Sequence, residues 1–319
     1  MRALITGVTG FVGSHMAEFL LNKGVEVHGA KRWRSPMDNI KHIRNEITLE
    51  ECELRDFASI NRVISKVRPD VIYHLAAQSY VPASFILPGD TLAVNVIGTA
   101  NLLEAIRLNK IDPIVHICSS SEVYGQVRPE EVPIKETNPL RPVSPYAVSK
   151  VGEDMLGYQY FVSYGIRTIR TRMFTHTGAR RGEFFVESSF AKQIAEIEKG
   201  VKKEPFVNVG NLESIRTFAD VRDAVRAYWL LTEKCRPGEV YNIGGNATMK
   251  VGEMLQKLIA MSEMKDIIKP RIDPSLLRPS DVTLQIPDTT KFSKETGWKP
   301  EIPFEKTMKD ILDYWRARV

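Results

Sequence analysis

The chain has 319 residues, of which 43% are hydrophobic and 26% are charged, a balance typical of a soluble globular protein with a substantial core. It has no apolar run of membrane-spanning length and no secretory signal pattern, so we expect neither a membrane protein nor an exported one. The net charge of +5 is too small and too diffuse to indicate a nucleic-acid-binding protein, although it could help to attract an anionic small molecule. Three scattered cysteines, Cys52, Cys118 and Cys235, match no metal site, so we expect reduced thiols, no bound metal and a cytoplasmic location.

The first strand, turn and helix predict a dinucleotide-binding site. Residues 3–5 form a short apolar strand, a glycine-rich turn follows, apolar residues at helical spacing cover 14–23, and a second strand covers 25–29. Glycines lack side chains, so backbone N–H groups and the helix N-terminus can approach a pyrophosphate. A glycine-rich turn without a ligand is the alternative. The residues expected to contact the cofactor here are Gly7, Thr9, Gly10, Phe11, Val12 and Gly13.

The segment after the second strand predicts which dinucleotide is bound. An acidic residue at this point would bind the 2′-hydroxyl of the adenosine ribose in NAD. The chain instead has a cationic cluster at 31–34, in which we expect Arg32 to pair with a 2′-phosphate. We therefore predict NADP in preference to NAD, with a solvated basic loop as the alternative.

Two further apolar segments are predicted to be buried strands of a parallel sheet, at 71–77 and 114–119, with a helix between them at 95–107. Ligands bind at the carboxyl edge of open α/β sheets. Ser120 and Glu122 follow the second of these strands, so we expect them at that edge. The first of these strands ends in small residues, which let the cofactor lie against the backbone, and the contacts expected there are Leu75, Ala76, Ala77 and Gln78.

Tyr146 and Lys150 are the predicted centre of the chemistry. A helix begins at Pro145, and the spacing of four residues places the phenol and the ammonium on one helix face. The lysine charge favours the phenolate and should lower the pKa of Tyr146, which would make it a proton acceptor near neutral pH. Ser120 could hold a substrate oxygen beside the phenol, and Glu122 adds a second acid/base group. For the tyrosine and lysine taken alone, two unrelated residues on an amphipathic helix are the alternative.

In the second half of the chain the regular alternation of strands and helices is lost. A loop there carries Arg180 and Arg181, whose guanidinium groups suit a diphosphate, and His176, which could line the nicotinamide end of the cofactor. A surface ion pair and a structural histidine are the alternatives. We predict a nucleotide-binding part at 1–170 and a substrate-binding part at 171–319, with an approximate boundary because the chain can cross back. Further helices are expected over 186–200, 220–231 and 251–261.

These motifs together resemble the extended short-chain dehydrogenase/reductase family, whose members act on nucleotide sugars. The resemblance covers essentially the whole chain. It implies an α/β fold, with a Rossmann-type doubly wound parallel sheet and a smaller C-terminal α/β part that binds the substrate. It also implies a homodimer or homotetramer, paired through the helices at 95–107 and 146–164. The residues that carry the resemblance are Thr6 to Gly13, Leu75 to Ala77, Ser120 with Glu122, and Tyr146 with Lys150.

Within that family, several stretches resemble the GDP-mannose 4,6-dehydratases. Those stretches are 28–32, 75–79, 121–125, His176 with Arg180–Glu183, 209–216, 278–281 and 297–300. The chain departs from the dehydratase pattern at Ser120, where threonine is usual, and at Thr175, where asparagine is usual. Its shortness and its ending at 310–315 resemble instead the GDP-4-keto-6-deoxy-mannose reductases. The segment 180–183 favours the dehydratases over the reductases.

The resemblance also implies a GDP-sugar substrate and a reaction. Tyr146, assisted by Lys150, would take the proton of the sugar 4-hydroxyl as C4 is oxidised. Glu122 would then remove the proton at C5 and help to expel the 6-hydroxyl as water, while Ser120 holds the sugar oxygen. A reductase, an epimerase and an NADP-binding sensor without chemistry are the alternatives. By the same resemblance, further contacts are Glu53 and Leu54 to adenine, Ser79 and Thr175 to the substrate, and Arg216 and Arg278 to its diphosphate.

Overall fold

Seven parallel strands form the central sheet, in the order β10–β6–β5–β4–β1–β2–β3. The computed structural model describes all residues from 1 to 319. The strand order reverses beside β1, which lies between β2 and β4, and ligands bind at such a switch point in open α/β sheets. The strands are β1 (Arg2–Thr6), β2 (Glu26–Lys31), β3 (Thr48–Glu51), β4 (Val71–His74), β5 (Ile114–Cys118), β6 (Thr168–Met173) and β10 (Val240–Ile243).

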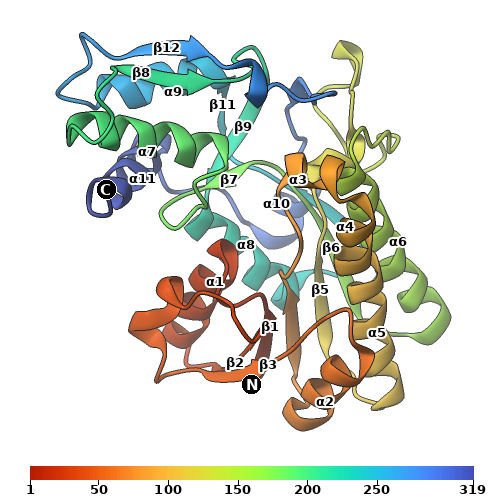
Figure 1. The fold of residues 1–319 in the computed structure, drawn as a ribbon. Helices are drawn as coiled ribbons and strands as arrows, with labels where there is room; N and C mark the ends of the chain where they lie inside the picture. The colour runs from red at the N-terminus through yellow and green to blue at the C-terminus, as the bar shows by residue number, and fades with distance from the viewer.

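Helices cover both faces of this sheet (Figure 1). Alternate residues of a strand point to opposite faces, so Ala3 and Ile5 pack into one core cluster and Leu4 into another. The first cluster lies under α1 (Phe11–Asn22), α8 (Val221–Lys234) and α10 (Thr290–Thr296). The second lies under α2 (Phe57–Val67), α5 (Gly98–Leu108) and α6 (Pro145–Tyr164). The doubly wound α/β fold predicted from the sequence is therefore confirmed.

A second, smaller lobe stands above the carboxyl edge of the sheet (Figure 1). It has its own core of 18 buried hydrophobic residues. The chain returns from this lobe to the main sheet through β10, which pairs with β6. The division at residue 170 stays a prediction. The helices of this lobe are α7 (Val186–Glu198), α9 (Val251–Ala260) and α11 (Phe304–Arg316), and its strands are β7 (His176–Thr177), β8 (Phe206–Val209), β9 (Ile215–Asp220), β11 (Ala247–Lys250), β12 (Lys269–Ile272) and β13 (Leu284–Gln285).

The helix predicted over 95–107 appears as α5 and the turn before it, and the segment between β4 and α5 is irregular. It contains two short helices, α3 (Val81–Ile86) and α4 (Pro88–Leu92), and then one turn of π-helix at Ala93–Ile97. The π turn turns Asn95 inward, where its side chain binds both the N–H and the C=O of Gln78. This irregular segment therefore fixes the end of β4, where the cleft described below begins. None of the helices is both long enough and apolar enough to cross a membrane.

Candidate active site

A cleft of about 1200 Å³ lies between the two lobes at the carboxyl edge of the sheet. Its lining includes the glycine turn, the ends of β2, β4 and β5, the start of α6, and loops of the smaller lobe. Every site residue predicted from the sequence, from Gly7 to Arg278, lines this one cleft. Their individual roles stay predictions, but residues more than 250 positions apart in the chain are brought together at one place.

The glycine turn leaves no room for side chains. Gly7 has a φ of +74°, and its N–H donates to Ala30 O at 3.0 Å, which ties the turn to β2. A Cβ added at Gly13 would lie 2.2 Å from the carbonyl oxygen of Gly7. Gly10 precedes the first residue of α1, so the positive end of that helix faces the cleft. This cradle has the shape and the electrostatics that the pyrophosphate of a dinucleotide requires.

A chain of hydrogen bonds fixes the backbone at the carboxyl end of β4. Thr6 Oγ1 accepts the N–H groups of Leu75 and Ala76, each at 3.1 Å. Both of its lone pairs are then used, so its own proton points to His74 Nδ1, 2.9 Å away. Burial lowers the pKa of His74 to about 3, so the ring is a neutral acceptor. The backbone at Leu75 and Ala76 is thereby fixed against the glycine turn.

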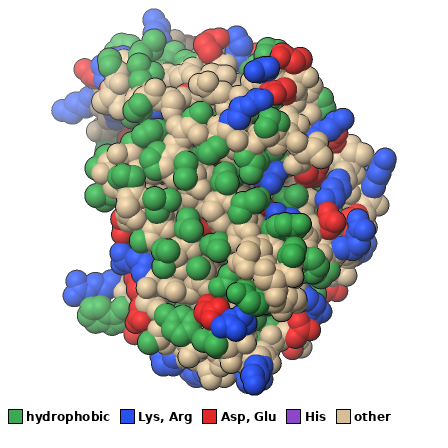
Figure 2. All heavy atoms as spheres, turned by 90° about the vertical axis from the view of Figure 1, so that its right-hand side faces the viewer, with side chains coloured by type: hydrophobic (Ala, Val, Ile, Leu, Met, Phe, Trp, Pro, Cys, Tyr) green, Lys and Arg blue, Asp and Glu red, His purple; other side chains and the backbone are tan.

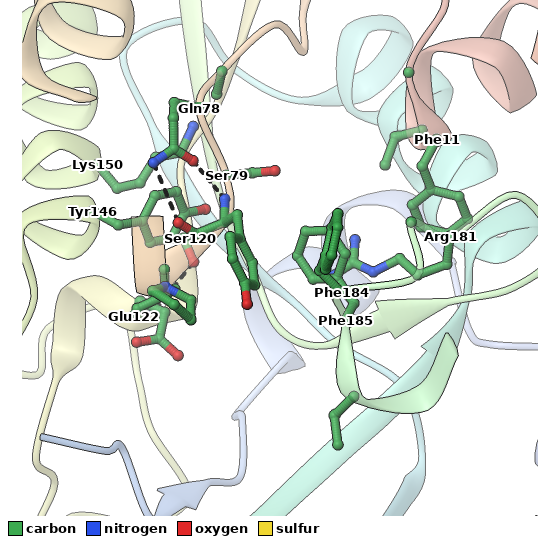
Figure 3. Close-up of a pocket in the computed structure, with 18 of the residues that line it drawn as sticks. Phe11, Gln78, Ser79, Ser120, Glu122, Tyr146, Lys150, Arg181, Phe184 and Phe185 are labelled. Carbon is green, nitrogen blue, oxygen red and sulfur yellow. Dashed lines mark hydrogen bonds between the residues drawn. The ribbon is translucent and has the colours of Figure 1, made fainter. Parts of the chain in front are cut away.

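Gln78 shapes the loop after β4 rather than offering its amide to a ligand. Its Nε2 donates to Tyr80 O and Thr91 Oγ1, at 3.2 and 3.1 Å. Its Oε1 accepts the N–H of Tyr80 at 2.6 Å (Figure 3). Asn95 binds the backbone N–H and C=O of Gln78 as well, so the predicted cofactor contact at this residue would be a van der Waals contact with its surface. Ser79, the next residue, is exposed in the cleft.

The edge of the cleft beyond β2 carries the features expected for a 2′-phosphate. Arg32 is exposed at the end of β2, and its guanidinium donates no hydrogen bond to the protein. Glu53 and Leu54 also line this edge, and Glu53 is held by Arg55 at 3.0 Å. A free guanidinium beside a nucleoside pocket fits NADP, because it can pair bidentately with a phosphate.

Replacing Arg32 with alanine is expected to weaken binding of NADP⁺ by roughly 10- to 100-fold, because charge-assisted hydrogen bonds contribute about 1.5–3 kcal/mol. The affinity for NAD⁺, which lacks the 2′-phosphate, should stay unchanged. Calorimetric titration with both dinucleotides measures the difference. Arg34→Ala is the matched control, because Arg34 packs over the Trp33 ring and does not line the cleft. Equal losses for both dinucleotides would contradict a phosphate contact at Arg32.

Tyr146 and Lys150 lie on one wall of the cleft, on the face of α6 turned to the sheet (Figure 3). Lys150 Nζ is 5.8 Å from the centre of the Tyr146 ring and donates to Cys118 O at 3.0 Å. Burial raises the pKa of Tyr146, while the charge of Lys150 and a hydrogen bond with Ser120 oppose that rise. The lysine thus acts in the predicted direction, but the prediction of a lowered pKa is wrong because the desolvation of the phenol outweighs it.

Glu122 is the second ionisable group on this wall. It lies in a turn of 3₁₀-helix, Ser121–Tyr124, that directly follows β5, and its N–H donates to Ser120 Oγ at 3.2 Å. Burial raises the pKa of its carboxyl, and the charges of Arg216 and Arg278 oppose the rise. A carboxyl group with a raised pKa can both accept and release a proton near neutral pH.

Asp281 joins the two arginines that the resemblance assigned to a diphosphate. Its carboxylate lies 3.5 Å from Arg216 and 3.7 Å from Arg278. It also accepts hydrogen bonds from Asn211 Nδ2 and Ser214 Oγ, at 2.9 and 3.0 Å. The loop that carries Arg278 is therefore tied to Arg216 of β9 and to the loop that precedes this strand. The positive charges of Arg216 and Arg278 lie opposite Glu122 in the cleft, so they suit an anionic group next to the reacting part of a substrate.

Arg180 and Arg181 point to different places although they are adjacent. Arg180 has a φ of +71°, and its guanidinium is engaged by Glu18 and Ser14. Arg181 lies between the rings of Phe11 and Phe185, 5.1 and 3.7 Å from their centres, on the wall opposite Tyr146 (Figure 3). Its guanidinium donates no hydrogen bond to the protein, and because Nε is buried, only the terminal N–H groups can reach a ligand. Of the two, Arg181 has the donor free for a ligand.

His176 and Thr175 complete the base of the opposite wall. The His176 ring stacks with Phe11 at 6.0 Å, and burial lowers its pKa to about 4, so the ring is neutral. The carbonyl of Thr175 accepts a hydrogen bond from the N–H of Ala219. Thr175 also lines the cleft.

Three groups of residues in the cleft or directly behind its wall escaped prediction. Asp281 ends the stretch 278–281, in which a role was predicted for Arg278 alone. Tyr80 packs against Phe184 and Phe185 across the cleft, at ring distances of 5.6 and 6.1 Å. Glu153 contacts Lys150. The Phe-Phe pair next to the two arginines was a visible signal, whereas the contacts of Tyr80 and Asp281 depend on the tertiary fold.

Comparison with known proteins agrees with this geometry. A sequence model of the family described as GDP-mannose 4,6 dehydratase matches residues 4–311. A GDP-mannose 4,6-dehydratase of Yersinia enterocolitica is 33% identical, over 98% of this chain and 92% of its own. A GDP-6-deoxy-D-mannose reductase of Pseudomonas aeruginosa is 32% identical, over 100% of this chain and 98% of its own. The solved structure of RMD from Pseudomonas aeruginosa complexed with NADPH superposes with a TM-score of 0.84 and 31% identity, covering 100% and 99% of the two chains.

The family model spans nearly the whole chain, and the relatives exceed 30% identity over nearly its full length. The cleft carries the glycine turn, the tyrosine–lysine pair and the serine–glutamate turn in one place. The chain therefore belongs to the GDP-mannose 4,6-dehydratase family, within the extended short-chain dehydrogenases/reductases.

Proposed function

We propose that this protein converts GDP-mannose to GDP-4-keto-6-deoxy-mannose and water, with NADP bound in the cleft. The observation that carries the proposal is the presence of two acid/base groups, Tyr146 and Glu122, on one wall of the cleft (Figure 3). An internal oxidation needs one proton acceptor at the 4-hydroxyl, and the elimination of water needs a second group at C5 and the 6-hydroxyl. A sensor without chemistry would need neither.

Each residue of that wall has a task in this reaction. Tyr146 takes the proton of the 4-hydroxyl, whose oxygen becomes the 4-keto oxygen of the product, and returns a proton to the substrate at C5 in the last step, while Ser120 holds the 4-oxygen in line. Glu122 removes the proton at C5, which the 4-keto group has made acidic, and delivers a proton to the departing 6-hydroxyl. Lys150 orients the cofactor and favours the phenolate of Tyr146. A bound nicotinamide supplies the acceptor and the later donor of the hydride, so no net oxidation occurs.

The remaining cleft residues would hold the nucleotide and the cofactor. Arg216 and Arg278 are placed to pair with the substrate diphosphate, because both face Glu122 and are bridged by Asp281. The glycine turn and Arg32 would hold the pyrophosphate and the 2′-phosphate of NADP. A cytoplasmic location, where both nucleotides are made available, stays part of this proposal.

Incubation of the purified protein with GDP-mannose and catalytic NADP⁺ tests the proposal. We expect a product lighter by one water, detected by mass spectrometry, with no net change in NADPH absorbance. The second candidate is a reductase of the 4-keto-6-deoxy sugar, which is favoured by the near-equal length of this chain and the reductase of Pseudomonas aeruginosa. NADPH oxidation with the 4-keto sugar, and none of the dehydration product from GDP-mannose, would replace the first function by the second.

We also propose that two copies pair through α5 and α6. On α6 the apolar side chains of Val148, Met155 and Val162 recur every seven residues and are 40–62% exposed, so they form one stripe. Ile97 and Leu108 are also exposed on the neighbouring segment. Figure 2 shows apolar side chains spread over this face of the molecule. An exposed apolar stripe on two adjacent helices suits a four-helix interface across a two-fold axis.

Met155→Glu is expected to convert the dimer to a monomer of 36.1 kDa. At a two-fold interface the substitution places two carboxylates close together in an apolar surrounding, and their desolvation opposes association. Sedimentation velocity measures the mass. Ile272→Glu is the matched control, because Ile272 is 69% exposed on β12 in the other lobe and should leave the dimer intact. A dimeric Met155→Glu protein would contradict this interface.

A further inference from the structure

Glu153 is a buried carboxylate for which the proposed chemistry has no task. Its side chain is 1% exposed, and its Oε2 accepts a hydrogen bond from Lys150 Nζ at 2.9 Å. Its other oxygen, Oε1, has no hydrogen-bond partner. Burial of a carboxylate with an unpaired oxygen opposes folding, so a residue of this kind calls for an explanation beyond stability.

Tyr146, Lys150 and Glu153 follow one another on a single face of α6. Spacings of four and three residues place their side chains in a row. The ammonium of Lys150 therefore stands between a phenol and a carboxylate. A second acceptor, Cys118 O at 3.0 Å, fixes the same ammonium to the end of β5. Two of its three protons are thus accepted by the protein, and one remains for a ligand.

The neighbouring carboxylate, Asp154, has no such relation to the site. It is fully buried, but its oxygens accept from Arg170 at 2.8 Å and from Arg172 at 2.7 Å. Its charge is therefore matched by two cations of β6. Glu153 has Lys150 alone, so any change in its charge is felt by the ammonium of Lys150.

The histidines and the thiol packed near this row are neutral. Burial lowers the pKa values of His74 on β4 and His116 on β5 to about 3, and burial raises the pKa of the Cys118 thiol. Burial also raises the pKa of Glu153 above the usual range of a glutamate, against the opposing charge of Lys150. Burial raises the pKa of Tyr228 on α8 as well, so this phenol is neutral, whereas Arg181 acts on Tyr146 from the opposite wall with a positive charge. On the helix of Tyr146 itself, the charges that act on it are those of Lys150 and Glu153.

We propose that Glu153 is a positioning residue that holds the Lys150 ammonium against β5 and offsets its charge, so that it sets the pH at which Tyr146 exchanges its proton. This inference rests on the proposed function, in which Tyr146 both takes and returns a proton. An ammonium without a counter-charge would favour the phenolate strongly, and a phenolate stabilised in this way would be a weak base that takes the proton of the 4-hydroxyl poorly. The negative charge of Glu153 weakens this preference of Tyr146 for the phenolate form.

The direction and size of the effect follow from electrostatics. Removal of the carboxylate leaves the charge of Lys150 to act alone, which stabilises the phenolate and lowers the pKa of Tyr146. Seven residues of helix separate the two side chains by about 10 Å. A unit charge at that distance, with the effective dielectric constant of protein sites, shifts a pKa by about one unit.

Glu153→Gln tests the inference through a readout that needs no sugar substrate. The ultraviolet absorbance of tyrosinate is followed against pH in this variant and in the wild-type protein, and the same titration in a Tyr146→Phe background is subtracted. We expect the Tyr146 midpoint to fall by about one unit in Glu153→Gln. Glu153→Asp keeps the charge and should restore the wild-type midpoint. Glu130→Gln, the same chemical change at an exposed position, should leave it unmoved.

Two results would overturn the inference. An unchanged midpoint, with a loss of thermal stability alone, would make Glu153 a purely structural residue, and a higher midpoint would reverse the sign of its effect. If the amide variant does not fold, Glu153→Ala, which leaves room for water beside Lys150, carries the same expectation. A protein that shows the shift but does not dehydrate GDP-mannose would refute the proposed function and leave the inference on Glu153 intact.

Discussion

Glu122→Gln is expected to lower the turnover of GDP-mannose by about a thousandfold, because general acid–base catalysis contributes about 10²–10⁴-fold. The amide has nearly the volume of the carboxyl and can keep its place after β5, but it cannot take the proton from C5. Binding of NADP⁺ should be unchanged, since the glycine turn and Arg32 lie elsewhere in the cleft. Steady-state kinetics with GDP-mannose and a calorimetric titration with NADP⁺ measure the two quantities.

The pH profile of the wild-type protein provides an independent check on Glu122. Because burial raises the pKa of its carboxyl, the basic form is lost at a higher pH than for an ordinary glutamate. Activity should therefore fall on the acid side of neutrality, and the fall should be absent from the residual activity of Glu122→Gln. Glu130→Gln, an exposed glutamate that follows β5 in the chain, serves as the matched control. Near-normal turnover in Glu122→Gln would assign the C5 proton to another group.

The elements that the sequence predicted are those with a strong local signal. The first strand, glycine turn and helix appear as β1 and α1, and the apolar runs at 71–77 and 114–119 appear as β4 and β5. The helix α2 was not predicted although Asp56 caps it and its buried residues keep helical spacing, so that signal was present and missed. The pairing of β8 with β12 and of β9 with β13 joins segments some 60 to 70 residues apart, and short strands of this kind carry no local pattern.

The candidate site likewise has features that local sequence patterns predict and features that they do not. Motifs at the ends of parallel strands could be assigned to one cleft because those ends meet at one edge of the sheet. The different directions of Arg180 and Arg181 depend on a left-handed backbone at Arg180, which the residue type does not favour. The raised pKa of Tyr146 depends on how deeply the phenol is buried, and Asp281 becomes part of the site because two distant loops meet around it. Such features require the tertiary structure.

Gly13→Ala is expected to weaken NADP⁺ binding strongly and to lower the stability of the protein modestly. The added Cβ would lie 2.2 Å from the Gly7 carbonyl oxygen, 2.8 Å from its carbon and 2.9 Å from Val8 Cα. All three are backbone atoms, so relief requires the turn itself to move away from α1. Overpacking of this kind should lower the free energy of unfolding by about 1–3 kcal/mol. The displaced N–H groups should also lose at least two charge-assisted hydrogen bonds to the pyrophosphate, a loss of about a hundredfold or more in affinity.

Affinity for NADP⁺ and thermal unfolding, measured on the same preparation, separate these two effects. Gly89→Ala is the matched control, because a Cβ there would meet no atom within 4 Å and should change neither quantity. The expected pattern for Gly13→Ala is a modest fall in the melting temperature with a severe loss of affinity, since the sheet and its two cores remain while the cradle is deformed. A Gly13→Ala protein that binds NADP⁺ normally would show that the pyrophosphate does not depend on the close approach of this turn to α1.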